Sequence, residues 1–345
     1  MKHRSTLLKT AALLIATSVT ANAQSPAEFY AAHNISIIVG YTPGSGYDLY
    51  ARLLARHYGK YIPGQPRIIV QNMPGGGSLT AANHVAQAAP RDGTVLGVIN
   101  RSLPIAALLQ TADPKTIRYD AFTLNYIGSM SEETTLAFTW AKTGVTKFEQ
   151  LRDRQITTGT QGVASDGFVL SSMLNSMFGT KIKVILGYTG TDKVYFAMEK
   201  GELDSYVGGT LGSLMASHPD WIKEGKVNVL VQLSSRRSQM LPDVPTIIEL
   251  AENETQRAAL GLVLAPQRMG RPVIAPPSLP ADRLSALQKA FDETMKDGTM
   301  LGEAERMKAE ISPMTGPEMR DFVRKLHEVQ PDALAIARHA VKAPE

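Results

Sequence analysis

The 345-residue sequence contains no cysteine. Disulfide bonds, cysteine-ligated metal sites, cysteine nucleophiles and the lipid-modified cysteine of a lipoprotein are therefore excluded. After the first 23 residues, no segment has the ~18 consecutive apolar residues that a membrane-spanning helix needs. The chain must be held together by a hydrophobic core, and its 43% hydrophobic and 20% charged residues are typical of a globular protein.

Motifs that would mark a phosphate cofactor or an enzyme are also missing. The sequence lacks a P-loop, a dinucleotide-binding Gly-x-Gly-x-x-Gly before a helix, a His-Glu-x-x-His zinc motif and the Gly-x-Ser-x-Gly elbow of hydrolases. Ser45 and Ser165 lie in glycine-rich turns, but neither has a histidine nearby in the sequence. We therefore expect no cofactor, no metal site and no enzymatic activity.

The N-terminus has the features of a secretory signal. Three basic residues precede a short apolar run, and Ala21-Asn22-Ala23 then supplies the small side chains that a signal peptidase requires. The apolar run is too short to span a bilayer. We therefore predict that residues 1–23 are a signal peptide and that the mature protein is periplasmic.

The basic character of the chain belongs to this leader. The full sequence has 36 Lys and Arg against 32 Asp and Glu, and three of the basic residues but none of the acidic ones lie in residues 1–23. The remainder carries 33 basic and 32 acidic side chains, a net charge of +1. Because no dense basic tract remains, the composition argues against a nucleic-acid partner.

Alternating strand and helix patterns predict an α/β fold. Short apolar runs end at glycine-rich or polar turns and are followed by amphipathic helical patterns, such as the one that begins at Asp48. This order favours mainly parallel sheets with helices on their faces. The expected strands are residues 35–39, 67–70, 94–99, 135–141, 155–158, 184–186, 205–207 and 227–232.

The same patterns predict two domains. A second α/β unit follows the first, and a proline-rich stretch after it indicates that the chain returns across the domain boundary. We assign residues 24–124 plus 236–345 to domain 1 and residues 125–235 to domain 2. We expect a hinge near residues 122–128 and 232–238.

Four glycine-rich turns precede predicted helices, at residues 44–46, 75–77, 159–167 and 187–190. A turn of this kind leaves backbone N–H groups unpaired at a helix N-terminus, where they bind anions without Lys or Arg. The alternative is that these glycines only make tight turns. Their Ser and Thr content, and the lack of basic residues in them, favour a small organic anion over pyrophosphate.

At these turns the sequence resembles the substrate-binding proteins of tripartite tricarboxylate transporters, the Bug proteins. The resemblance runs through nearly the whole mature chain, with Ser45 in place of a usual glycine and Met73 where Arg is common. The motifs that carry it are Ile37–Val39 with Pro43–Asp48, Val70–Gly77, Ala89–Thr94 and Leu241–Thr246 with Glu249.

This resemblance implies a two-domain clamshell of the type II periplasmic-binding-protein kind. It also implies a monomer that binds a small organic carboxylate between its lobes and delivers it to integral membrane transporter subunits. Two alternatives stay open: a periplasmic hydrolase that uses the same cleft, and a sensor module that presents the ligand to a receptor.

The ligand-binding candidates come from the turns and from the end of the third strand. The resemblance points to Gly44, Ser45, Gly46, Asp48, Thr160, Gln161, Ser165, Asp166, Tyr188 and Thr189. Position in or next to the turns adds Tyr41, Tyr47, Asn100 and Gly190. We expect Asp48 and Asp166 to orient water or cap helices, because carboxylates repel a bound carboxylate, and the tyrosines to cover an apolar face of the ligand.

Overall fold

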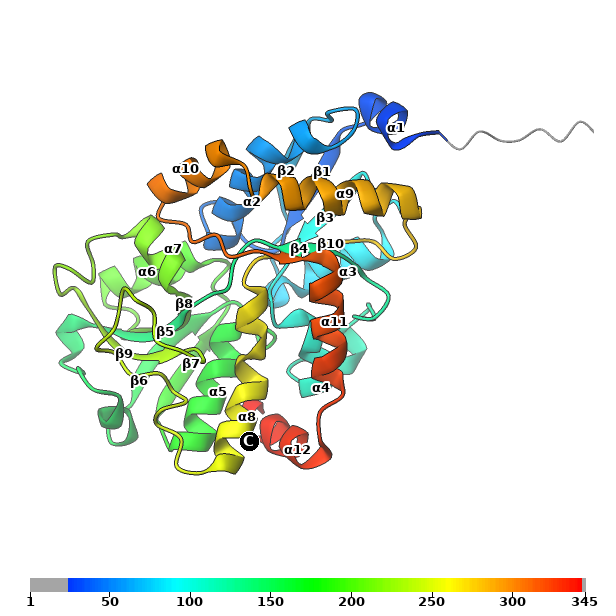
Figure 1. The fold of residues 1–345 in the computed structure, drawn as a ribbon. Helices are drawn as coiled ribbons and strands as arrows, with labels where there is room; N and C mark the ends of the chain where they lie inside the picture. The colour runs from blue at the N-terminus through cyan, green and yellow to red at the C-terminus, as the bar shows by residue number, and fades with distance from the viewer. Residues whose placement is uncertain (1–23, 343–345) are drawn as a thin grey trace, which may run out of the picture.

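The computed structural model describes residues 24–342 and shows two α/β lobes, each built on its own sheet (Figure 1). The predicted signal peptide, residues 1–23, lies outside the described residues. Among the helices of residues 24–342, none combines the length and the apolar character needed to cross a bilayer.

The first lobe contains a six-stranded sheet in the order β11-β4-β10-β3-β1-β2. β1 pairs in parallel with β2 and β3, whereas β10 is antiparallel to both of its neighbours. The strands are β1 (Ile35–Val39), β2 (Ile68–Asn72), β3 (Val95–Val98), β4 (Asn125–Ser129), β10 (Pro272–Ala275) and β11 (Met314–Thr315).

The second lobe contains a five-stranded sheet in the order β7-β6-β8-β5-β9. β6 is parallel to β7 and β8, and β5 is antiparallel to β8 and β9. The strands are β5 (Thr135–Trp140), β6 (Ile156–Thr160), β7 (Ile182–Leu186), β8 (Ser205–Thr210) and β9 (Val227–Leu233).

All eight strands expected from the sequence are confirmed, and most strands of each sheet run in one direction as expected, although antiparallel strands make both sheets mixed. Of the strands that run against this direction, β5 and β10 enter from the opposite lobe, whereas the two-residue β11 follows α10 of its own lobe. β5 follows the crossing from β4, and β10 follows the return from the second lobe. A strand that enters at the edge facing the other lobe starts where the parallel strands end, and therefore runs antiparallel to them.

Helices cover both faces of each sheet, so each lobe has three layers. Around the first sheet lie α1 (Pro26–Ala32), α2 (Gly46–Tyr58), α3 (Leu79–Gln87), α9 (Ala281–Thr294), α10 (Gly298–Arg306) and α11 (Gly316–His327). Around the second lie α5 (Asp166–Phe178), α6 (Thr191–Lys200), α7 (Leu211–Ser217), α8 (Glu254–Leu264) and α12 (Pro331–Val341). The short α4 (Ala106–Leu109) contributes Ala106 to the core of the first lobe and Leu109 to that of the second.

Strand periodicity divides each core into two halves. In β1, Ile37 and Val39 face the cluster under α2 and α9, and Ile38 faces the cluster under α3 and α11. In β8, Val207 faces α5 and α12, whereas Tyr206 faces α6 and α7. This alternation follows from the period of two along a strand.

The C-terminal helix packs on the second lobe. Figure 1 shows α12 beside α8 and α5, and its Ala337 and Ala340 share a buried cluster with Val169 and Leu170 of α5. The division into residues 24–124 plus 236–345 and residues 125–235 remains a prediction. From the packing, we propose that β4 belongs to the first lobe and that α8 and α12 belong to the second.

The two lobes contact each other at glycine residues of the second and third glycine-rich turns. A Cβ on Gly77, in the second glycine turn, would lie 2.7 Å from the backbone nitrogen of Ser165 in the other lobe. A Cβ on Gly162 would lie 3.2 Å from the carbonyl carbon of Gly76. The backbones of the second and third turns therefore approach as closely as they do because neither carries a side chain.

Gly77→Ala is expected to hold the lobes apart. Gly179, at the end of α5, is a matched control because it has the same φ of 67° but open space around it. Both substitutions place alanine in a left-handed conformation that costs about 1–2 kcal/mol. Only Gly77→Ala should also increase the radius of gyration measured by small-angle X-ray scattering, and an equal radius for the two variants would contradict the assignment.

Candidate functional site

A small cavity of about 30 Å³ lies where the two lobes meet. It is bounded by residues that follow β1, β3 and β6, by the end of β8 and by the starts of several helices. Ligands gather at this carboxyl edge of the strands in open α/β sheets. The lining residues are Tyr41, Gly46, Tyr47, Asn100, Arg101, Gln161, Asp166, Gly167, Thr191, Tyr206, Gly208, Thr210, Ser213 and Arg271.

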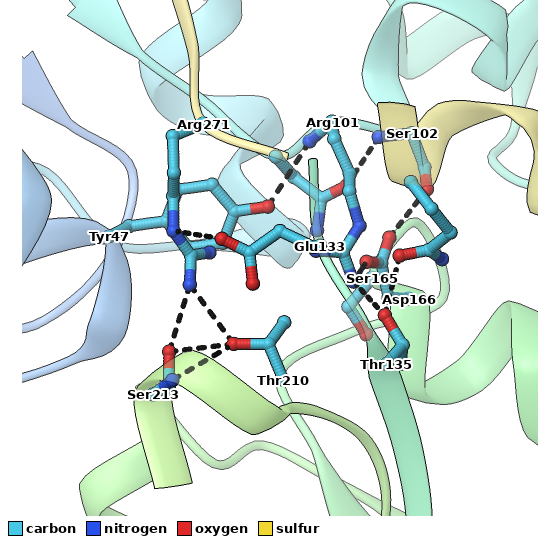
Figure 2. Close-up of polar contacts among 12 residues, drawn as sticks. Tyr47, Arg101, Ser102, Glu133, Thr135, Ser165, Asp166, Thr210, Ser213 and Arg271 are labelled. Carbon is cyan, nitrogen blue, oxygen red and sulfur yellow. Dashed lines mark hydrogen bonds and ion pairs between the residues drawn. The ribbon is translucent and has the colours of Figure 1, made fainter. Parts of the chain in front are cut away.

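Three buried charged side chains line this cavity, Arg101, Asp166 and Arg271, and a fourth, Glu133, pairs with Arg271 beside it (Figure 2). Arg101 follows β3 in the first lobe, and its Nη2 forms an ion pair with Asp166, the first residue of α5 in the second lobe. Arg271 precedes β10, and its Nε lies 3.1 Å from Oε1 of Glu133, in the segment between β4 and β5. The charges of the four side chains sum to zero.

Hydroxyl groups surround the Arg101–Asp166 pair. The Arg101 Nη2 also donates to Oγ1 of Thr135 at 2.8 Å, and the Ser102 hydroxyl donates to Oδ1 of Asp166. Asp166 thereby contacts two residues of the first lobe, Arg101 through an ion pair and Ser102 through a hydrogen bond. The pair is an interlobe contact as well as part of the cavity wall.

Arg271 also reaches across to the second lobe. Its Nη2 donates to Oγ1 of Thr210 at 3.1 Å and to Oγ of Ser213 at 2.8 Å, at the start of α7 (Figure 2). Its guanidinium lies 4.5 Å from the ring centroid of Tyr47 and 4.7 Å from that of Tyr50. These cation–π contacts stabilise a buried charge that would be costly without them.

Burial and the neighbouring charges set the protonation states. Burial acts to lower the pKa of Arg101, but the charge of Asp166 together with Tyr47, Glu133 and Tyr41 outweighs it, so the pKa lies above its ordinary value and the side chain stays charged. Burial raises the pKa of Tyr47 to about 12, so its hydroxyl is protonated at neutral pH. That hydroxyl accepts the backbone N–H of Arg101 at 3.2 Å, which leaves its own proton for another acceptor.

Arg101 has donors without acceptors. Its side chain is 1% exposed, yet its Nε and Nη1 have no hydrogen-bond partner. The Nε of Arg271 is close enough to Glu133 for an ion pair but not aligned for a hydrogen bond. An unsatisfied buried donor costs about 1–3 kcal/mol, and more when it is charged. The cavity wall is therefore able to hydrogen-bond an acceptor that the described chain does not supply.

The first glycine turn uses its polar groups internally. The Ser45 hydroxyl caps α2 by accepting the N–H of Asp48 at 3.3 Å. Asp48 accepts the N–H of Gly44 at 2.9 Å and the Nε of Arg52 at 2.9 Å, and its other oxygen accepts from Asn72 at 2.8 Å. Ser45 and Asp48 thus shape the turn, and Gly46 is the residue of residues 44–46 that reaches the cavity.

The third and fourth glycine-rich turns also use polar groups for hydrogen bonds within the protein. The Thr160 and Ser165 hydroxyls lie 2.6 Å apart, and Ser165 donates to the Gly162 carbonyl. Tyr188 is half-buried and donates its N–H to the Thr160 carbonyl, whereas the Thr189 side chain is exposed. Gly190 begins α6 and packs against Thr42 of the first lobe.

Six of the fourteen candidates from the sequence line the cavity: Tyr41, Gly46, Tyr47, Asn100, Gln161 and Asp166. Their rings and amides are already ordered, since Tyr41 stacks on Tyr47 at 4.5 Å and accepts from Asn100 at 2.6 Å. The other eight, Gly44, Ser45, Asp48, Thr160, Ser165, Tyr188, Thr189 and Gly190, lie outside the lining. Whether any of them contacts a ligand stays a prediction.

Comparison with known proteins identifies the family. Residues 51–308 match the model of the tripartite tricarboxylate transporter family receptor, which covers well over half of the chain. The chain belongs to this family. It is therefore a solute-binding receptor of the tripartite tricarboxylate transporter type and not an enzyme, as expected from the sequence.

Individual relatives agree with this assignment. The receptor is similar to Protein BugT of Bordetella pertussis (strain Tohama I), with 27% identity over 272 residues, 76% of this chain and 78% of BugT. Its fold matches the periplasmic binding protein BugD with a TM-score of 0.72 and 17% identity, over 90% of this chain and 98% of BugD. It also matches MatC of Rhodopseudomonas palustris, solved with bound malate, with a TM-score of 0.68 and 19% identity, over 90% and 99% of the two chains.

The two arginines that line the cavity, Arg101 and Arg271, are not among the ligand-binding residues predicted from the sequence. The glycine turns were expected to bind an anion without Lys or Arg, but Arg101 and Arg271 line the cavity. Both stand beside a predicted boundary: Arg101 follows Asn100 at the end of a strand, and Arg271 precedes Pro272 in the proline-rich return. These positions next to predicted boundaries were the only features of the sequence that could have pointed to the two arginines as site residues.

Asp48→Asn is expected to make the receptor's stability less dependent on acid pH. Burial acts to raise the pKa of Asp48, but hydrogen bonds from Arg52, Asn72 and Gly44 hold it below its usual value. The native state then binds fewer protons than the unfolded state, so the stabilisation is complete above the unfolded pKa of about 3.9 and is lost as pH falls through the folded pKa.

Thermal unfolding followed by circular dichroism across pH 2–7 tests this. Near neutral pH the variant should be less stable by about 1.5–3 kcal/mol, and the difference should shrink toward the acid end of the scan. Asp321→Asn, on the exposed surface of α11, is the control and should change little. A pH-independent difference for Asp48→Asn would refute the proposed cause.

Proposed function

We propose that this receptor captures a small organic carboxylate between its lobes. In this proposal the signal peptide of residues 1–23 directs the chain to the periplasm, where it acts as a monomer. It then delivers its ligand to the integral membrane subunits of a tripartite transporter. Family membership and the lack of a membrane-spanning helix in residues 24–342 support this role.

The observation that carries the ligand class is the unsatisfied guanidinium of Arg101. A guanidinium presents its N–H groups in a planar fork that matches the two oxygens of a carboxylate. Arg101 uses Nη2 for Asp166 and Thr135 and keeps Nε and Nη1 without partners. Because Nε and Nη1 donate from different edges of the guanidinium, a ligand carboxylate oxygen that accepts from either one would remove the cost of leaving that donor buried and unpaired.

The lobes must open for a ligand to enter. A water molecule needs roughly 10–15 Å³ of such space, so the cavity of about 30 Å³ has room for about two waters and not for an organic acid. We propose that opening bends the chain at residues 130–134, between β4 and β5, and at residues 265–271, between α8 and β10. This moves the predicted first hinge to just after β4 and the predicted second hinge, near residues 232–238, to the end of α8.

Malate bound to MatC is compatible with this ligand class. At 19% identity the likeness to MatC concerns the fold alone, so the class here depends on the chemistry of the cleft. Mass spectrometry of small molecules released from the purified receptor, followed by calorimetry with a panel of carboxylates, tests the proposal. Binding of sugars or metal cations and of no carboxylate would refute it.

Arg101→Lys is expected to weaken carboxylate binding. Lysine keeps the positive charge opposite Asp166 but loses the fork, so at least one charge-assisted hydrogen bond of about 1.5–3 kcal/mol disappears. Calorimetry should show a dissociation constant about 10- to 150-fold higher.

Arg320→Lys is the matched control. Arg320 is exposed on α11 and pairs with Asp321 away from the cleft cavity, at 3.1 Å. The control should bind like the unmodified receptor, with both variants unfolding at similar temperatures. Equal affinity of Arg101→Lys and the control would remove Arg101 from the site.

A further inference from the structure

The electrostatic neutrality of the cleft restricts what kind of carboxylate fits. Arg101 is opposed by Asp166 and Arg271 by Glu133, and none of the four side chains is more than 7% exposed. An unbalanced charge is strongly disfavoured in such a desolvated site. A ligand that brings only negative charge would leave the closed cleft with a net charge of its own.

Helix dipoles do not change this balance. Four helices begin at the interface of the lobes, and three of them, α2, α5 and α6, carry an aspartate in the first turn: Asp48, Asp166 and Asp192. A carboxylate there already offsets the partial positive charge of the helix N-terminus. The fourth helix, α7, has no acidic residue in its first turn, but it has only seven residues and its Ser213 N–H is already accepted by the Thr210 hydroxyl at 3.2 Å. The helix starts therefore add little positive charge for a second or third ligand carboxylate.

Asp166 has capacity for a further donor. Its Oδ1 accepts a hydrogen bond from Ser102 and its Oδ2 forms the ion pair with Arg101, whereas an ionised carboxylate offers about four lone-pair sites. Asp166 lines the cavity together with the aromatic side chains of Tyr47 and Tyr206. Acceptors and ring faces of this kind suit an ammonium group.

We propose that the ligand is a zwitterion, an amino acid or similar amino-carboxylate, and that Asp166 is the residue that selects it. In this arrangement the ligand carboxylate accepts from one of the free donors of Arg101, Nε or Nη1, and the ligand ammonium donates to Asp166. The closed, loaded cleft then stays neutral. This inference rests on the proposed carboxylate function and narrows it.

A competing interpretation gives the opposite result. Asp166 could occupy the place of a ligand carboxylate, so that any acid must displace it from Arg101. Removing its charge would then tighten the binding of simple carboxylates. In the zwitterion proposal, removing the charge weakens the binding of amino acids instead, because their ammonium loses its partner.

Calorimetry with matched ligand pairs distinguishes the two. The probes are L-glutamate with glutarate and L-alanine with propionate, in which each second molecule lacks only the amino group. For the unmodified receptor, the amino acid of the better-binding pair should bind at least tenfold more tightly than its partner. This comparison needs no variant, so it tests the proposal even if a substitution fails to fold.

Asp166→Asn should abolish that preference. Its affinity for the amino acid should fall by about tenfold or more, while its affinity for the deaminated acid stays the same or rises. Asp192→Asn is the matched control, an equal change of charge at another helix start of the cleft but outside the cavity lining. It should alter both members of a pair by the same factor.

Each remaining outcome overturns one specific claim. If the unmodified receptor binds the deaminated acids as well as or better than the amino acids, the zwitterion proposal is wrong while the carboxylate function stands. If Asp166→Asn tightens binding of the simple acids without weakening that of the amino acids, Asp166 is an internal competitor. If neither these probes nor the wider carboxylate panel bind, the proposed function itself fails.

Discussion

The ion pair between Arg101 and Asp166 is the contact on which the closed arrangement of the lobes depends. It joins the end of β3 in one sheet to the start of α5 beside the other, and both side chains are buried. Burying either charge without the other would cost several kcal/mol. The closed state therefore places the two lobes so that this pair and its hydroxyl partners Ser102 and Thr135 come together.

The second pair links the cleft to the hinge. Glu133 lies in the segment through which the chain leaves the first lobe, and Arg271 lies where it returns. Glu133 also lines a larger cavity of about 800 Å³, bounded by the return segment and the ends of α8 and α10, whereas Arg271 lines the cleft. Because Arg271 also donates to Thr210 and Ser213, a bend at the hinge must reorganise the cleft wall.

Local patterns in the sequence predicted the elements and the edge where the site lies. The apolar run at residues 35–39 and the glycine turn after it place β1, α2 and the loop between them, because strand periodicity and turn chemistry are local properties. They could not predict that Arg101 meets Asp166, since the two residues are 65 positions apart and belong to different lobes. A single arginine after a strand has no periodicity that distinguishes a buried side chain from an exposed one.

The glycine turns also show the difference between what a local sequence pattern predicts and what contacts between distant residues determine. Glycine-rich turns ahead of helices indicate anion binding by backbone amides, but Gly77 and Gly162 let two backbones touch across the lobes. The first turns of α2, α5 and α6 each hold an aspartate that offsets the helix dipole. The second and third turns thus bring the lobes together, and Arg101 and Arg271 add positive charge to the cavity lining, while anion binding by the turn amides stays a prediction. Since each arginine is matched by an acid, ligand charge and lobe closure are parts of one electrostatic balance.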